Sequence, residues 1–155
     1  MTRYTVSRSI EVAAPAKRVW ETVRDFGAFE VWFPTSEEVS PQIVWTGDRN
    51  EIGVERHIIF DGGPRFCERL ISIDEDQSTI SYSLVESPFP IDDHLAMLHV
   101  QDRGGKSLVT WSATFCAEDE STFAMMDSVM GSQNFEPGLA GLKRYIEKQD
   151  SKPGS

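Results

Sequence analysis

The stretch Ser121–Lys148 constrains the fold most, because it carries the longest helical pattern in the sequence. Apolar side chains recur along it at spacings of three and four residues, the period of one face of an α-helix. The residues on this face are Met126, Val129, Met130, Leu139, Leu142, Tyr145 and Ile146. Pro137 lies inside the pattern and predicts a kink, or a division of the helix at Phe135 and Glu136. An amphipathic helix of this length needs a large apolar surface to pack against.

The sequence between Arg3 and Glu118 supplies that surface, because most of it predicts β-strands. The strands are expected at Tyr4–Val12, Val39–Thr46, Gly53–Phe60, Arg65–Ile73, Thr79–Val85, Asp93–Val100 and Lys106–Ala117. Two short helices, Ala16–Phe26 and Ala28–Phe33, are expected after the first strand. Short turns rich in Gly, Asp and Pro favour antiparallel neighbours. The order predicts an α+β fold in which a curved seven-stranded antiparallel sheet wraps the C-terminal helix.

Length and charge narrow the classes of function. The 155 residues suit one domain, expected at 1–149, with a flexible tail at 150–155. The formal net charge of -10 argues against nucleic acid or an anionic membrane as a partner. The sequence shows no signal-peptide pattern and no apolar run of roughly 18 residues, so we expect a cytoplasmic chain without a membrane span. The oligomeric state is left open.

Cysteine and histidine spacing shows no metal-binding pattern. Cys67 and Cys116 each lie within an expected strand, and we expect both to be reduced. Neither a CxxC nor a His-x-x-x-His spacing occurs. We therefore expect no metal ion and no other cofactor.

Five phrases, in this order along the chain, resemble the helix-grip superfamily. They are Ile10–Trp20, Cys67–Asp74, Ile80–Leu84, Val109–Ser112 and Gly138–Glu147. The superfamily includes START-like lipid-transfer domains, birch-pollen-allergen-type proteins and bacterial polyketide cyclase/dehydrase-like proteins of the SRPBCC type, and the small bacterial members are the most similar. The resemblance implies a deep cavity between the sheet and the last helix. The small residues Gly138, Ala140 and Gly141 are interpreted as leaving room for it. The fold hosts many functions, so it does not name the ligand.

The strand phase of that superfamily, extended by the alternation of side chains along a strand, predicts the cavity wall. The strand residues expected to face inward are Arg56, Ile58, Phe60, Phe66, Glu68, Leu70, Tyr82, Leu84, His94, Leu98, Trp111 and Ala113. Met126, Met130 and Asn134 are expected from the last helix, and Trp32, Phe33 and Phe89 at the mouth. His57 and His99 are expected to face outward. A symmetric turn at Asp61–Arg65 would place Phe60 opposite Phe66, and Arg56 one diagonal step from Glu68.

Four inward positions are polar, and each has a structural and a functional interpretation. Arg56 and Glu68 form either a purely structural ion pair or a contact with a ligand. Tyr82 is either a core residue or a ligand contact. His94 lies either in water at a strand end or in the cavity as a proton shuttle. The methionines of the last helix either line the pocket or pack conventionally.

Two functions are therefore weighed, with a weaker third. The first is a carrier or sensor that binds a hydrophobic or aromatic small molecule in the cavity. The second is a cyclase-, dehydrase- or aromatase-type enzyme, with Glu68 and His94 as the catalytic pair. The third is an adaptor that contacts a partner protein through exposed aromatic loops. The sequence alone separates these poorly, because no nucleophile–base pair can be recognised without geometry.

Overall fold

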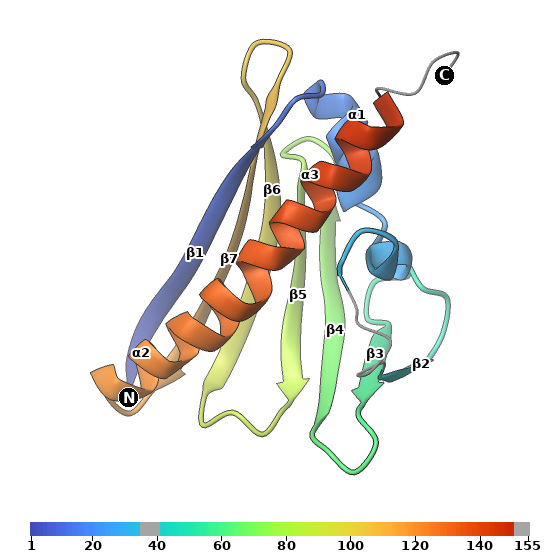
Figure 1. Cartoon of the computed structure of the whole chain (residues 1–155). Helices are drawn as coiled ribbons and strands as arrows, with labels where there is room; N and C mark the ends of the chain where they lie inside the picture. The colour runs from blue at the N-terminus through green and yellow to red at the C-terminus, as the bar shows by residue number, and fades with distance from the viewer. Residues whose placement is uncertain (35–40, 151–155) are drawn as a thin grey trace.

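A seven-stranded antiparallel sheet curves around one long helix, as the sequence predicts (Figure 1). The computed structural model describes residues 1–34 and 41–150. The strands are β1 (Thr2–Val12), β2 (Gln42–Trp45), β3 (Glu55–Ile59), β4 (Arg65–Asp74), β5 (Thr79–Glu86), β6 (Asp92–Asp102) and β7 (Ser107–Ala117). Their order across the sheet is β1-β7-β6-β5-β4-β3-β2, a meander closed at one edge by β1. The expected tail, apart from Asp150 at the end of the last helix, lies outside the described residues.

Two strands begin later than predicted. The expected start of β2 at Val39 and Ser40 lies outside the described residues, and the observed strand starts at Gln42, directly after Pro41. β3 begins at Glu55 rather than at Gly53. Gly53 has a φ of 93°, a conformation that glycine adopts readily and that a strand does not use. The residues before β3 therefore form a turn.

Two short helices follow β1. Helix α1 (Ala16–Val23) ends before the predicted Phe26, and Val19, Trp20 and Val23 form its buried face. The next segment is the 3₁₀ helix η1 (Phe26–Val31), which starts two residues earlier than the predicted helix. The break between them is at Asp25, whose φ of -85° and ψ of 83° are not helical.

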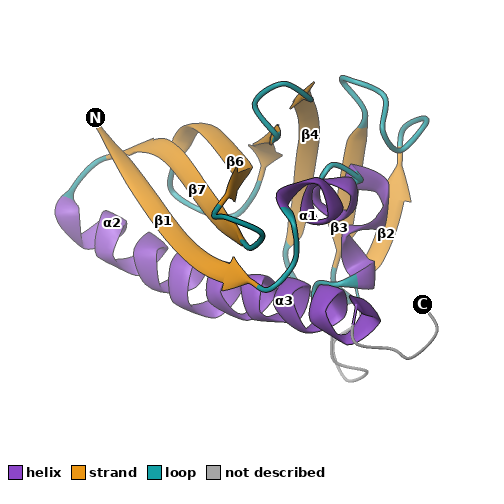
Figure 2. Cartoon of the chain, turned by 90° about the horizontal axis from the view of Figure 1, so that it is seen from above, coloured by secondary structure: helices purple, strands orange, loops and turns teal. Residues whose placement is uncertain are grey.

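The long C-terminal helix has three parts that run along one face of the sheet (Figure 2). They are α2 (Glu120–Met126), the π-helical segment η3 (Asp127–Phe135) and α3 (Glu136–Asp150). Pro137 lies in the first turn of α3, where its missing N–H is tolerated. The change from π- to α-helix falls at Phe135 and Glu136, the predicted point of division. Among the described residues, none of the helices has both the length and the apolar character needed to cross a membrane.

The glycines of α3 permit close packing against the rest of the chain. A Cβ at Gly141 would lie 2.3 Å from the carbonyl oxygen of Trp32, and one at Gly138 would lie 2.7 Å from the ring of Trp111. The room beside these glycines is thus filled by protein atoms, and the interpretation of it as the cavity is wrong. The cavity lies further toward the start of the helix, beside η3.

Arg8 is the one charged residue on the face of β1 that carries the buried side chains of Val6 and Val12. Its guanidinium binds both carboxylate oxygens of Asp127, at 3.1 and 3.2 Å, and its Nε donates to Glu136 at 3.0 Å. These hydrogen bonds, the one to Asp127 first, raise the pKa of Arg8. Gly131 leaves space for the arginine, because a Cβ there would lie 2.5 Å from Nη2. Arg8 therefore ties β1 to η3.

Candidate functional site

A cavity of about 740 Å³ lies between the sheet, η1 and η3. Its walls come from η1 and the residues after it, from β2 to β7, and from the π-helical segment. The lining residues are Phe29, Glu30, Phe33, Pro34, Pro41, Ile43, Arg56, Ile58, Phe60, Phe66, Glu68, Tyr82, Leu84, Phe89, His94, Trp111, Val129, Met130, Asn134 and Phe135. Most of these side chains are apolar and many are aromatic, with a few polar groups among them. This composition is that of a small-molecule site.

Most of the predicted wall residues line this cavity. They are Arg56, Ile58, Phe60, Phe66, Glu68, Tyr82, Leu84, His94, Trp111, Met130 and Asn134, and Phe33 and Phe89 of the expected mouth line it as well. The strand residues in this set were predicted from the alternation of side chains along each strand. Asn134 is exposed, so it lies where the cavity meets solvent.

Five predicted residues do not line the cavity. Leu70, Ala113 and Met126 are at most 1% exposed and belong to the packed core. Leu98 and Trp32 border a separate void of about 20 Å³. The partition between the two spaces is formed by the residues that border both of them, Phe29, Arg56, Tyr82 and Trp111. The alternation of side chains along a strand assigned every inward strand residue to the cavity. The helices, however, pack against one end of the sheet and fill the space there.

Several wall residues were missed by the sequence analysis. Phe29 and Glu30 come from the short helix η1, and Pro34 and Pro41 come from irregular chain. These segments are too short or too irregular for a repeating pattern to indicate which way a side chain faces. Ile43 lies on β2. Val129 and Phe135 belong to the π-helical segment η3. Val129 shares its apolar face with Met130, but only the methionines of that face were assigned to the wall. The high aromatic content of Phe26–Phe33 is the sequence feature that could have indicated that this segment contributes to the wall.

Arg56 and Glu68 form an ion pair at the floor of the cavity. They are direct partners across β3 and β4, and Arg56 Nε donates to Glu68 Oε1 at 2.7 Å. The predicted diagonal relation is wrong, because Ile58 rather than Phe60 lies opposite Phe66. Phe60 belongs to the turn instead, where its N–H donates to the carbonyl of Pro64 at 3.3 Å.

The same arginine holds η1 over the sheet. Its guanidinium carbon lies 4.0 Å from the ring centre of Phe26 and 3.9 Å from that of Phe29. Nη1 donates to the carbonyl of Phe26 at 3.2 Å. The Arg56 side chain is 4% exposed and the Glu68 side chain 15%. A buried charge needs such partners, so this arrangement joins the cavity floor to its covering segment.

Tyr82 and Trp111 are joined above the ion pair. Trp111 Nε1 donates to the Tyr82 hydroxyl oxygen at 3.0 Å. Burial, and next the carboxylate of Glu68, raise the pKa of Tyr82. Tyr82 is therefore neutral, and its own hydroxyl proton remains available to a second acceptor.

A β-bulge aims His94 into the cavity. Asp92 lies opposite Cys116 and Leu95 opposite Thr114, so Asp93 and His94 together face one residue of β7. Asp93 has a φ of 53° at this point. His94 Nδ1 accepts a hydrogen bond from the Leu84 backbone N–H at 2.9 Å. Bulges commonly redirect a side chain in this way.

The hydrogen bond from Leu84 also settles the state of the His94 ring. Because Nδ1 is an acceptor, Nε2 carries the proton of the neutral imidazole. Burial lowers the pKa of His94, and the nearby Glu68 carboxylate opposes that shift. Near neutral pH the ring is therefore uncharged, with Nε2 as a donor. The site combines this donor with the carboxylate of Glu68, the neutral hydroxyl of Tyr82 and an apolar wall.

Comparison with known proteins gives consistent matches. The sequence model of the family described as polyketide cyclase/dehydrase and lipid transport matches residues 3–147. No curated protein matches the chain.

Several solved structures have the same fold. A protein from Thermobifida fusca, solved by solution NMR, is 34% identical, covers 93% of each chain and has a TM-score of 0.80. XoxI from Bacillus cereus is 22% identical over 98% of this chain and 100% of its own, with a TM-score of 0.75. Norcoclaurine synthase from Thalictrum flavum is 13% identical over 97% and 98%, with a TM-score of 0.81. At that identity the likeness concerns the fold alone.

The sequence match covers nearly the whole chain, and the observed sheet, long helix and intervening cavity agree with it. The chain belongs to the polyketide cyclase/dehydrase and lipid transport family.

Proposed function

We propose that the protein binds a hydrophobic or aromatic small molecule in the cavity between the sheet and the C-terminal helix, as a carrier or sensor. The cavity volume of about 740 Å³ carries this proposal. Small-molecule sites typically measure roughly 300–1,000 Å³ and have apolar walls with a few polar groups that orient the ligand. The family description, which includes lipid transport, supports the same class of ligand.

The wall chemistry favours a neutral ligand with one polar end. Arg56 and Glu68 offset each other's charge, so the floor presents no unpaired ion to a guest. A charged guest would lose its hydration without gaining a counterion. The Nε2–H of His94 and the hydroxyl of Tyr82 can instead bind a carbonyl or hydroxyl group. The rings of Phe33, Phe66 and Phe89 line the apolar part of the space.

Filling the cavity tests this proposal. Leu84 lines the cavity, whereas Val85, the next residue on β5, is 42% exposed and does not line it. We expect Leu84→Trp to weaken the binding of any compound that binds the wild type by about tenfold or more, which equals about 1.4 kcal/mol. Isothermal calorimetry and the shift in melting temperature, with fatty acids, flavonoids and polyketide mimics, measure this effect.

Val85→Trp is the matched control, because it adds the same side chain outside the cavity. Its affinity should equal that of the wild type. A compound bound equally well by the wild type and by Leu84→Trp would show that binding occurs elsewhere.

A second candidate function is an enzyme that acts next to a carbonyl group. Its support is that Glu68 and His94 line the same cavity. His94 Nε2–H would donate to the carbonyl oxygen, and the Glu68 carboxylate would accept a proton from the adjacent carbon. Nδ1 of His94 already accepts from Leu84, so the neutral ring is a donor rather than the base. A structural neighbour, norcoclaurine synthase, has been solved with dopamine and hydroxybenzaldehyde.

The enzyme candidate predicts a loss of turnover in two variants. We expect Glu68→Gln and His94→Gln each to lower the turnover of a polyketide mimic by roughly 100-fold or more, the usual contribution of acid–base catalysis. Because the pKa of His94 lies below 6.5, wild-type activity should be constant above that pH and change only at lower pH, where the ring gains a proton. Melting curves check that both variants fold. Turnover equal to the wild type in both would exclude this pair.

A further inference from the structure

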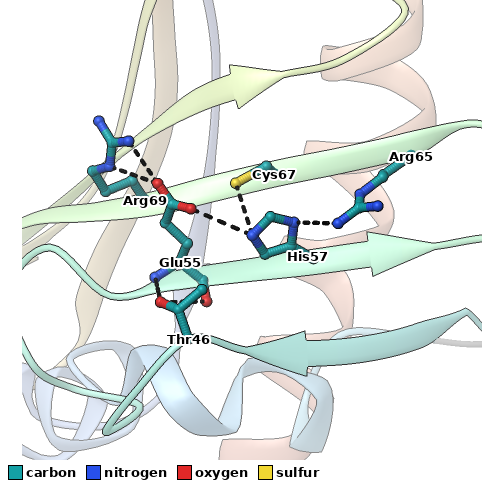
Figure 3. A network of polar contacts seen from close by, with 6 residues as sticks. All are labelled: Thr46, Glu55, His57, Arg65, Cys67 and Arg69. Atoms are coloured by element: carbon teal, nitrogen blue, oxygen red, sulfur yellow. Dashed lines mark hydrogen bonds and ion pairs between the residues drawn. The ribbon is translucent and has the colours of Figure 1, made fainter.

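Three side chains with metal-binding atoms meet on the outer face of the sheet, away from the cavity (Figure 3). Glu55 and His57 are two residues apart on β3 and so share one face. Cys67 on β4 lies directly opposite His57. Arg56, which lies between Glu55 and His57, and Glu68, which follows Cys67, face the opposite way and line the cavity. Strand alternation and hairpin register thus bring the three side chains together.

The two distances from His57 to the other ligand atoms are those of neighbouring corners of a tetrahedron around zinc. His57 Nε2 lies 3.3 Å from Glu55 Oε1 and 3.6 Å from Cys67 Sγ. All three atoms lie within 4.8 Å of one another. Zinc binds sulfur at about 2.3 Å and nitrogen or oxygen at about 2.0–2.2 Å, so tetrahedral ligands stand roughly 3.3–3.6 Å apart.

We propose that Glu55, His57 and Cys67 bind one divalent cation of the zinc class. A thiolate, an imidazole and a carboxylate form a mixed ligand set that suits zinc and not magnesium or calcium. Three protein ligands leave a fourth position for water. His57 and Glu55 are part-exposed, with side chains 17% and 22% exposed, so an ion can reach the site.

Arg69 orients the carboxylate of Glu55. Its Nε and Nη2 both donate to Oε2, at 3.0 and 2.6 Å, which leaves Oε1 directed toward His57. Metal-binding carboxylates are commonly held in this way by an outer partner. The backbone N–H of Glu55 donates to Thr46 Oγ1 at 3.0 Å, and this bond links the site to the end of β2.

Arg65 and the thiol proton both oppose binding. Arg65 Nη2 donates to His57 Nδ1 at 2.9 Å, but a neutral imidazole that binds a metal through Nε2 carries its proton on Nδ1. Arg65 is exposed and must therefore swing away. Burial raises the pKa of the Cys67 thiol to about 11, so binding releases its proton. The arginine supplies a variant that should strengthen binding.

Cobalt(II) tests the proposal, because its spectrum reports both thiolate ligation and tetrahedral geometry. The full-length reduced protein is titrated with CoCl₂, and then with ZnCl₂ as the competitor. We expect a sulfur-to-cobalt charge-transfer band that saturates at one equivalent and disappears when zinc is added. Arg65→Gln should increase the affinity severalfold.

Two ligand variants and one control complete the test. Cys67→Ser and His57→Gln should each lower the affinity by more than about 100-fold, since losing even an outer partner costs roughly 10–100-fold. His57 is part-exposed, so its variant serves if the buried Cys67 variant fails to fold. Cys116→Ser removes the other thiol and should bind cobalt as the wild type does. The absence of a band in the folded wild type would overturn the proposal. So would a band kept in either ligand variant, or one lost only in Cys116→Ser.

Discussion

Replacing Arg56 with methionine should lower the free energy of unfolding by about 3–5 kcal/mol, the usual cost of removing one partner of a buried ion pair. In this variant the Glu68 carboxylate remains beside the cavity but loses the guanidinium that donates to it at 2.7 Å in the wild type. It also removes the hydrogen bond to the carbonyl of Phe26 and the contacts with the rings of Phe26 and Phe29. The 3₁₀ helix η1 should loosen as a result, and urea unfolding measures the loss of stability.

Two further variants show whether the buried charge is the cause. Arg69→Met removes an ion pair with Glu55 on the outer face of the same hairpin, where the arginine side chain is 45% exposed. It should cost at most about 1 kcal/mol, as exposed pairs do. The double variant Arg56→Met with Glu68→Leu should recover part of the loss, because no unpaired charge remains. A loss for Arg56→Met as small as that for Arg69→Met would contradict this account.

Trp111→Ala should lower the free energy of unfolding by about 3–5 kcal/mol, as large-to-small changes in a core do. Trp111 is 5% exposed and stacks on Phe135 with ring centres 4.5 Å apart. Its ring also makes T-shaped contacts with the rings of Trp32 and Phe33. The indole fills the space between η1, the sheet and η3, so its removal merges the cavity with the smaller void. The hydroxyl of Tyr82 would also lose its donor.

Ser112→Ala is the matched control for Trp111→Ala. Ser112 is the next residue on β7 and lies on the opposite face of the sheet, where its change should alter the free energy of unfolding by less than about 0.5 kcal/mol. Chemical denaturation and melting curves measure both variants. A loss below about 1 kcal/mol for Trp111→Ala would mean that the surrounding rings collapse into the space, contrary to the expected cost of a large-to-small change.

The strand residues of the site could be predicted because a strand has only two faces. Once Arg56 is placed inward, alternation assigns Ile58 on β3 and the inward positions of β4. Alternation does not state how far along the sheet the cavity extends. It therefore assigned Leu70 and Leu98 to the wall, although the helices pack against that end.

The helical and irregular residues of the site were harder to predict. The helical spacing places Val129 on the same apolar face as Met126 and Met130, but it does not state which part of that face meets the cavity and which part meets the packed core. Phe29 reaches the wall from the short 3₁₀ helix η1, and Pro41 reaches it from irregular chain. The opposition of Arg56 and Glu68 also depended on the turn at Phe60–Pro64, whose length decides the register.

The order of strands and helices and the alternation of the two faces of each strand were determined by the amino-acid sequence itself, because hydrophobic periodicity is a local property of the chain. The choice of the inward face, in contrast, came from the strand phase of the similar superfamily. The extent of the cavity, the ion pair beneath η1, the hydrogen bond from Leu84 to His94 and the group formed by Glu55, His57 and Cys67 were decided only by the tertiary structure. Each of these joins residues from different elements, and their distances depend on register, bulges and the packing of side chains that no local pattern contains.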